Sequence, residues 1–198
     1  NAITGIADAN ADSVPMLVFT GQVATPGIGK DAFQEADIIG VTMPITKYNY
    51  QIRETQDIPR VITEAIHIAT TGRPGPVVID LPKDIAAQEV AYINDTTIDL
   101  PSYHPTVEPN AKQLKKIVEL LAKKKRPLIL VGGGVNYSNG NLALTQFAEK
   151  YQIPVVSSLL GLGAMPVENP LFLGMGGMHG SYAANMALAE TDYLINFG

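Results

Sequence analysis

The sequence predicts an α/β protein in which parallel sheets are covered by helices. Short apolar runs that end at a glycine or a proline alternate with amphipathic segments, and this order is typical of parallel strands joined by crossover helices. The composition agrees, because 46% of the 198 residues are hydrophobic and 17% are charged, as in folded globular proteins. The length suits one large domain or two small ones.

Two buried strands and one helix are predicted in the first half. Residues 16–19 form a continuous apolar run and residues 76–81 a mainly apolar one, of the kind found in strands buried on both faces. Between them, residues 57–70 carry one apolar stripe at helical spacing. Asp57 can cap this helix, and Pro59 falls in its first turn.

The stretch that follows changes character and divides the chain. Residues 85–109 are rich in Asn, Asp, Thr and Pro and show no sustained period. Such a long irregular stretch is unusual inside a compact domain. We therefore expect one domain over 1–84, a linker over 85–109 and a second domain over 110–198.

The second domain restarts the alternation of strands and helices. Asn110 with Gln113 resembles a capping box at the start of a helix. The remaining expected elements are strands at 128–131, 153–156 and 193–197, helices around 144–151 and over 181–190, and a loop region over 159–180.

Charge and composition exclude several functions. A net charge of -5 argues against nucleic-acid binding, and the basic run 123–126 suits the end of a helix. No apolar run approaches the roughly 18 residues that span a membrane, and the three histidines lack ligand spacing, so no metal site is predicted. The absence of cysteine fits a reducing, cytoplasmic setting. Both ends fall within apolar runs, so the chain reads as an excerpt.

Loops that follow parallel strands are the expected ligand-binding segments. In the loop over 20–35, Phe33 and Gln34 offer an apolar face and an amide, although residue type alone favours a surface loop with Phe33 in the core. Lys83 follows the strand 76–81, where a cation suits a carboxylate or phosphate. A solvated Lys83 paired with Asp84 is an equal alternative.

Two glycine-rich segments of the second half are the other candidates. Gly132, Gly133 and Gly134 follow a strand and precede a helix, as in phosphate-binding turns. The dinucleotide fingerprint is incomplete, because Tyr137 stands where its third glycine belongs. Further along, His179 and its neighbours suit a flat aromatic ligand, or His179 hydrogen-bonds a turn.

Taken together and in this order, these segments resemble biosynthetic acetolactate synthase large subunits. The resemblance covers nearly the whole chain and is weakest over the linker, and it rests on the ordered set rather than on one motif. The segments that carry it are Thr20 to Val23, Asp31 to Glu35, Ile45 to Tyr50, Gly72 to Asp84, Val131 to Gly134, Leu159 to Gly163 and Gly177 to Gly180.

The resemblance implies an enzyme of three domains, of which this chain holds two in part. Residues 1–84 would be the later part of the pyrimidine domain for thiamine diphosphate, and 110–198 the early part of a Rossmann-like FAD-binding domain. Phe33, Gln34 and Lys83 would border the substrate channel. The residues that would contact or line the FAD site are Arg73, Gly132, Gly133, Ser158, Leu159, Gly177, Met178 and His179.

The family's reaction condenses pyruvate with pyruvate or 2-oxobutyrate and releases CO2, in branched-chain amino-acid biosynthesis. The resemblance implies a structural FAD, because this reaction has no net oxidation. It places the activating glutamate before Asn1, and the Mg²⁺ and diphosphate ligands in a third domain. The chain alone would therefore be inactive.

The resemblance also implies a homo-oligomer, a dimer or a tetramer, and allows a regulatory subunit. Three alternatives stay open at this point. The chain could belong to another flavin-containing carboligase, such as glyoxylate carboligase. It could also be a non-catalytic FAD-binding module, or an excerpt that binds nothing.

Overall fold

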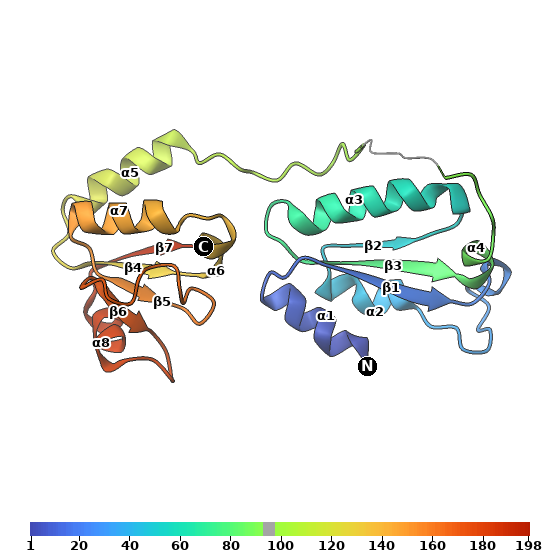
Figure 1. The fold of residues 1–198 in the computed structure, drawn as a ribbon, viewed down its shortest axis with the longest axis horizontal. Coiled ribbons are helices and arrows are strands. Elements are labelled where there is room, and N and C mark those ends of the chain that lie inside the picture. The colour runs from blue at the N-terminus through green and yellow to red at the C-terminus, as the bar shows by residue number, and fades with distance from the viewer. Residues whose placement is uncertain (93–97) are drawn as a thin grey trace. The chain divides into compact units, whose positions relative to one another are not determined.

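The computed structural model describes residues 1–92 and 98–198 (Figure 1). The chain divides into two compact units, unit 1 over Asn1–Glu108 and unit 2 over Pro109–Gly198. Every strand pairing in both units is parallel, so the prediction of an α/β chain with parallel sheets is confirmed. In the described part of the chain, no helix is long and apolar enough to cross a membrane.

Unit 1 is built on a three-stranded sheet of order β1-β3-β2. The strands are β1 (Met16–Gln22), β2 (Tyr48–Gln51) and β3 (Pro76–Pro82). The helices are α1 (Ala2–Ala11), α2 (Ile38–Thr42), α3 (Ile58–Thr70) and α4 (Lys83–Ala86), with short 3₁₀ turns at Thr25–Gly27, Met43–Ile45 and Thr55–Asp57. The central strand β3 is buried along nearly its whole length, as its mainly apolar sequence predicts.

The two faces of β3 meet different helices. Val77 and Ile79 pack with Val61, Ala65 and other residues of α3 in one core cluster. Alternation along the strand turns Val78 and Asp80 to the opposite face, where α1 and α2 lie (Figure 1). Both faces are therefore covered, although β1 and β2 remain edge strands in this sheet.

The helix α3 begins one residue later than expected, with the predicted residue at its N-cap position. Asp57 is the N-cap residue but makes no side-chain capping bond. Its carboxylate instead accepts a hydrogen bond from Arg60 at 3.1 Å. The predicted capping bond is absent because the Asp57 backbone is already helical, with φ -77° and ψ -16°, whereas a capping side chain reaches the N2 or N3 amide from an extended backbone. Pro59 does lie in the first turn.

Part of the stretch expected to be a linker is anchored on unit 1. Leu100 and Tyr103 pack against the core cluster beneath α3. The Tyr103 hydroxyl lies 2.9 Å from the Thr71 carbonyl oxygen and 3.0 Å from the Lys47 ammonium. The Tyr103 hydroxyl thus binds a backbone carbonyl at the C-terminal end of α3.

Unit 2 is built on a four-stranded sheet of order β6-β5-β4-β7. The core on one face is formed mainly by β4, β5 and α7, and the core on the other face by β4, β5 and α8. The strands are β4 (Pro127–Val131), β5 (Val155–Ser157), β6 (Phe172–Met175) and β7 (Tyr193–Phe197). The helices are α5 (Ala111–Leu121), α6 (Gly133–Tyr137), α7 (Asn141–Tyr151) and α8 (Tyr182–Glu190).

The start of α5 follows half of the predicted capping box. The Asn110 side chain accepts hydrogen bonds from the amides of Lys112 and Gln113, at 3.0 and 3.2 Å.

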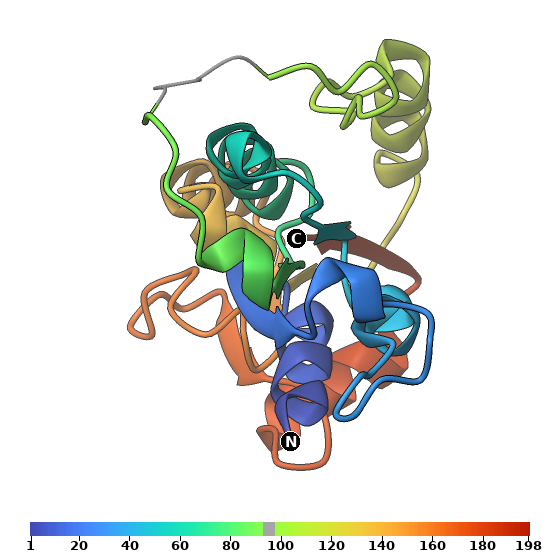
Figure 2. The same ribbon diagram turned by 90° about the vertical axis from the view of Figure 1, so that its right-hand side faces the viewer.

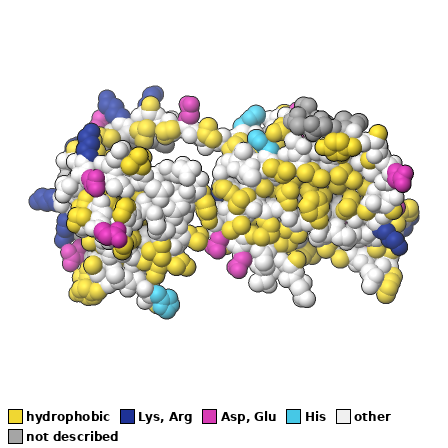
Figure 3. All heavy atoms as spheres, viewed as in Figure 1, with side chains coloured by type: hydrophobic (Ala, Val, Ile, Leu, Met, Phe, Trp, Pro, Cys, Tyr) yellow, Lys and Arg dark blue, Asp and Glu magenta, His cyan; other side chains and the backbone are white. Residues whose placement is uncertain are grey.

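In unit 1, hydrophobic side chains gather on the face where β1 lies (Figure 3), and Met16 and Phe19 of this edge strand are 36% and 56% exposed.

Candidate functional site

The carboxyl ends of β1 and β3 in unit 1 carry two of the expected functional segments (Figure 2). Residues 23–36 form the loop between β1 and α2, and Lys83 directly follows β3 as the first residue of α4. Phe33 is 90% exposed, so the expectation that it belongs to the core was wrong. Gln34 is also exposed, and its φ of 67° places it in the left-handed region.

The carboxylate of Glu35 stabilises the loop 23–36, of which it is part. Glu35 accepts hydrogen bonds from the amides of Gly29 and Ala32, the latter at 3.0 Å. These bonds, that of Gly29 first, hold the pKa of Glu35 below its usual value. Three residues of this segment have positive φ angles, and they are Gly29, Asp31 and Gln34. The ring of bonds around Glu35 stabilises this tight turn, so that the neighbouring Phe33 and Gln34 project from an ordered backbone.

A second carboxylate joins this loop to the segment that carries Lys83. Asp84 accepts hydrogen bonds from the Thr25 amide at 2.9 Å and from the Thr25 hydroxyl. The bond from the hydroxyl is the main cause of the lowered pKa of Asp84. Within the residues described, Lys83 forms no ion pair, so the alternative of a Lys83–Asp84 pair is not supported. Phe33, Gln34 and Lys83 therefore lie on two segments joined at one sheet edge.

A buried polar network lies beneath this edge, and the sequence reasoning did not single it out. Asp80 of β3 is fully buried. One of its oxygens accepts from Thr20 at 2.7 Å, and the other accepts from Gln22 at 3.2 Å and Gln51 at 3.1 Å. The available signal was one acidic residue inside the apolar run 76–81.

Arg73 lies at the opposite end of β3, so it is not brought close to Lys83. Seven strand residues separate the two edges, a distance of roughly 20 Å. The Arg73 guanidinium donates to the Ser13 hydroxyl at 2.8 Å and to the carbonyls of Asn10 and Ala11, both at 3.0 Å. It therefore closes the C-terminal end of α1, and its role toward FAD stays a prediction.

In unit 2, the segment after β5 forms a compact turn. The Ser158 hydroxyl accepts from the Gly161 amide at 3.2 Å, and Leu159 is 69% exposed. A methyl group on Gly161 would lie 2.1 Å from the Val131 carbonyl oxygen, so only glycine allows this approach. Asn136 of α6 donates to two carbonyls of the turn.

The side chain of Asn185 binds the backbone of the segment after β6. Asn185 of α8 accepts from the Gly177 amide at 2.8 Å and donates to the Gly177 carbonyl at 2.9 Å. Met178 is 93% exposed, and His179 is exposed beside it. Across the described residues, the His179 ring makes no hydrogen bond. Asn185, rather than His179, therefore holds this turn.

The triple glycine is packed against protein atoms. Methyl groups on Gly132 and Gly134 would lie 2.6 and 2.8 Å from backbone atoms of Gly198, and one on Gly133 would lie 3.0 Å from Leu160. The Gly132 amide donates to the Phe197 carbonyl at 2.7 Å. Close packing of β4 against β7 and the following turn thus accounts for these glycines, and their contact with FAD stays a prediction.

The other two segments of unit 2 fit an apolar aromatic ligand better. Methyl groups on Gly163 and Gly177 would meet open space, and Leu159 and Met178 expose most of their side chains at the carboxyl edge of the sheet. A hollow of about 560 Å³ adjoins Gly163 and Leu162. Within the described chain, none of the residues expected to bind FAD lines it.

No metal site is found in the described part of the chain. There, no group of three or more His, Asp or Glu side chains is arranged to hold an ion. The two carboxylates beside the functional loop, Glu35 and Asp84, are each occupied by hydrogen bonds from the backbone.

Comparison with known families assigns both halves of the chain to one class of enzyme. Residues 1–41 match the family model described as "Thiamine pyrophosphate enzyme, N-terminal TPP binding domain". Residues 114–198 match the one described as "Thiamine pyrophosphate enzyme, central domain". The two matches, together with the parallel α/β units that carry them, assign residues 1–41 and 114–198 to domain families of thiamine pyrophosphate enzymes.

Curated relatives narrow the class. The chain is 62% identical over 198 residues to the acetolactate synthase large subunit of Lactococcus lactis and 48% identical over 198 residues to that of Corynebacterium glutamicum. It is 50% identical over 201 residues to a probable acetolactate synthase large subunit of Methanocaldococcus jannaschii. These alignments cover the whole of this chain and 34%, 32% and 34% of the relatives. The chain belongs to the acetolactate synthase large-subunit family, and it spans about a third of the length of the relatives it matches.

Proposed function

We propose that this chain works as part of an acetolactate synthase, which joins pyruvate to a second 2-oxo acid and releases CO2. The observation that carries the proposal is the 62% identity over the whole chain to an acetolactate synthase large subunit. The match extends over the whole chain, so it includes both carboxyl-edge loops. The loops of unit 1 also have the chemistry that a 2-oxo acid needs.

Three residues of unit 1 are proposed to face the substrate. Lys83 offers an ammonium group with no ion-pair partner among the described residues, which suits the carboxylate of a 2-oxo acid. Gln34 offers an amide that can hydrogen-bond the keto oxygen, and Phe33 offers an exposed apolar wall that excludes water. The bonds from Thr25 to Asp84 hold the two segments together, so these groups act by orienting the reactants.

Two cofactors belong to the proposal. Thiamine diphosphate would supply the electron sink for loss of CO2 from the first 2-oxo acid, with Mg²⁺ holding its diphosphate on residues of the full-length protein. FAD would be bound mainly by residues of unit 2 and would not be redox-cycled, because two pyruvates give acetolactate and CO2 without net oxidation. The residues proposed to contact FAD are Arg73, Gly132, Gly133, Ser158, Leu159, Gly177, Met178 and His179.

The test is turnover by the full-length protein with pyruvate, thiamine diphosphate, Mg²⁺ and FAD. One CO2 should appear for every two molecules of pyruvate consumed, together with one acetolactate. Bound FAD should show its visible absorbance in the purified protein. Conversion of glyoxylate without conversion of pyruvate would instead support a different carboligase and contradict the proposal.

Lys83→Ala tests the proposed contact with the substrate. Loss of an electrostatic contact to a carboxylate should lower kcat/KM for pyruvate by roughly ten- to a hundredfold. Lys30→Ala is the matched control, because Lys30 is an exposed lysine in the same loop region and should leave kcat/KM unchanged. Equal effects of the two substitutions would show that Lys83 does not contact the substrate.

A further inference from the structure

The buried carboxyl group of Asp80 is not explained by packing. It lies on the central strand of unit 1 and is fully buried, and its three partners, Thr20, Gln22 and Gln51, are neutral hydrogen-bond donors. Among the residues described, no lysine, arginine or histidine pairs with it. A buried carboxyl group without a cation is costly compared with an apolar side chain. The neighbouring residues of β3 show that an apolar side chain suits this strand.

The partners of Asp80 connect it to the functional loop. Gln22 is the last residue of β1, and its amide nitrogen donates both to Asp80 and to the Ala36 carbonyl, the latter at 2.8 Å. The amide oxygen of Gln22 accepts from the Val23 amide at 2.9 Å. One side chain therefore binds the first residue, Val23, and the last residue, Ala36, of the loop 23–36.

The other strands fix the carboxyl group itself. Thr20 and Gln51 stand directly opposite Asp80 in the two strand pairings, so each can reach one of its oxygens without distortion of the sheet. Gln51 binds the same oxygen as Gln22. The carboxyl group is thus held from both sides, and it presents a fixed acceptor to the amide of Gln22.

We propose that Asp80 is a positioning residue. It orients the Gln22 amide, and through this amide it fixes the loop 23–36, which presents Phe33 and Gln34 beside the segment of Lys83. The consequence for catalysis rests on the proposed function, whereas the consequence for the loop does not. Asparagine at position 80 keeps one oxygen for the two glutamines and turns its amide nitrogen to the Thr20 hydroxyl, so Asp80→Asn should preserve the arrangement.

The test compares two buried carboxylates of the same unit in the full-length protein. Asp80→Leu removes the acceptor beneath the loop, and Glu64→Leu is the matched control, because Glu64 is equally buried but contacts Tyr50 and Arg60 on the α3 face. Both substitutions should lower Tm. Only Asp80→Leu should speed hydrogen exchange of the amides in 23–36, by about tenfold, which corresponds to the loss of one hydrogen bond.

The kinetic arm uses the same variants with pyruvate as the probe. Asp80→Leu should raise KM severalfold and should lower kcat by a smaller factor. Asp80→Asn should leave both KM and the exchange rates at their values in the unmodified protein. Equal exchange in the loop for Asp80→Leu and Glu64→Leu would overturn the proposal. If Asp80→Leu does not fold, Gln22→Leu breaks the same connection and must reproduce the faster exchange. A full-length protein that does not convert pyruvate would refute the proposed function, and the exchange rates would still decide the role of Asp80.

Discussion

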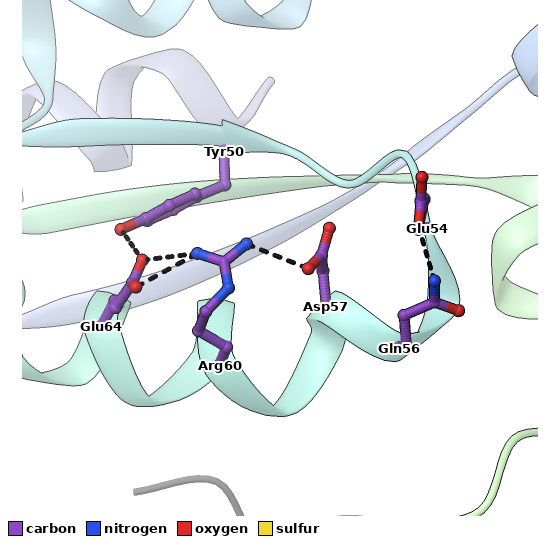
Figure 4. A network of polar contacts seen from close by, with 6 residues as sticks. All are labelled: Tyr50, Glu54, Gln56, Asp57, Arg60 and Glu64. Atoms are coloured by element: carbon purple, nitrogen blue, oxygen red, sulfur yellow. Dashed lines mark hydrogen bonds and ion pairs between the residues drawn. The ribbon is translucent and has the colours of Figure 1, made fainter. Parts of the chain in front are cut away.

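The contact between Glu64 and Tyr50 allows a quantitative test of how unit 1 is held together. Glu64 of α3 is 3% exposed, and its carboxylate accepts a hydrogen bond from the Tyr50 hydroxyl of β2 at 2.9 Å (Figure 4). Arg60 donates to both oxygens of the same carboxylate at 3.1 and 3.2 Å and also binds Asp57. The network therefore joins the edge strand β2 to the helix that covers it.

Glu64→Leu should lower the free energy of unfolding of unit 1 by about 2 kcal/mol. Loss of a hydrogen bond to a charged group costs about 1.5–3 kcal/mol, and the half-buried Tyr50 hydroxyl left without an acceptor adds about 1 kcal/mol. The ion pair adds little, because the Arg60 side chain is 41% exposed and solvent screens it. Burial of the leucine offsets about 1.5 kcal/mol.

A double-mutant cycle isolates the hydrogen bond from these other contributions. Tyr50→Phe should cost about 1.5 kcal/mol in the unmodified protein and should recover about 1 kcal/mol beside Glu64→Leu, because it then removes the hydroxyl that was left without an acceptor. The opening free energy of amides in the central strand β3, measured by native-state hydrogen exchange, reports both values. Equal costs of Tyr50→Phe in the two backgrounds would refute the reasoning.

Three further outcomes follow from other contacts. Gly161→Ala should destabilise unit 2 by about 3 kcal/mol, because the new methyl group meets a β4 carbonyl oxygen at 2.1 Å, whereas Gly5→Ala in open space on α1 should stabilise unit 1 by about 0.5–1 kcal/mol. Thermal unfolding measures both changes, and only a small loss of stability in Gly161→Ala would contradict the close approach of Gly161 to β4. The pKa of Asp84 is lowered, so its bonds to Thr25 stabilise the fold at every pH above its usual pKa of 3.8, and this stability is lost as the pH falls through the lower folded pKa. A carboxyl ¹³C titration should show the lowered pKa of Asp84, and Thr25→Val should return it toward 3.8. Burial raises the pKa of Tyr50 far above its usual 10.0, so its contribution to stability is present below pH 10 and lost as the pH rises further; tyrosinate absorbance should show one late-titrating tyrosine that Tyr50→Phe removes.

The sequence predicted the central strands and the edge strands β1 and β7, and it missed the short edge strands β2 and β6. The run 76–81 became β3 almost residue for residue, because a continuous apolar run is typical of a central parallel strand. The edge strand β2 was not expected, since Tyr48–Gln51 has no apolar run. Its alternation of tyrosine with an amide residue was the available signal: Tyr50 packs toward α3, and Gln51 reaches Asp80 on the other face.

The side-chain environments of the candidate site residues could not be predicted from the sequence. Position after a strand was enough to select the loops that hold Gln34 and Lys83. It was not enough to show that Phe33 is exposed, or that Arg73 closes the end of α1. Such contacts join residues far apart in the chain, 60 positions in the case of Arg73 and Ser13. Local pattern carries no information about them, because the tertiary fold decides which partner is within reach.

The two units hold their exposed loops by the same physical means. A loop that presents apolar side chains to a ligand cannot be fixed by burying those side chains, since burial would remove them from the ligand. Short polar side chains that bind the loop backbone solve this problem at no loss of exposure. The side chains that do so are Gln22, Glu35, Asp84, Asn136, Ser158 and Asn185. Phe33 and Met178, the two most exposed large hydrophobic side chains of the chain's described residues, both lie in loops held in this way. Their exposure beside an ordered backbone is therefore what a ligand-facing position requires, and a loop held only by apolar packing would not provide it.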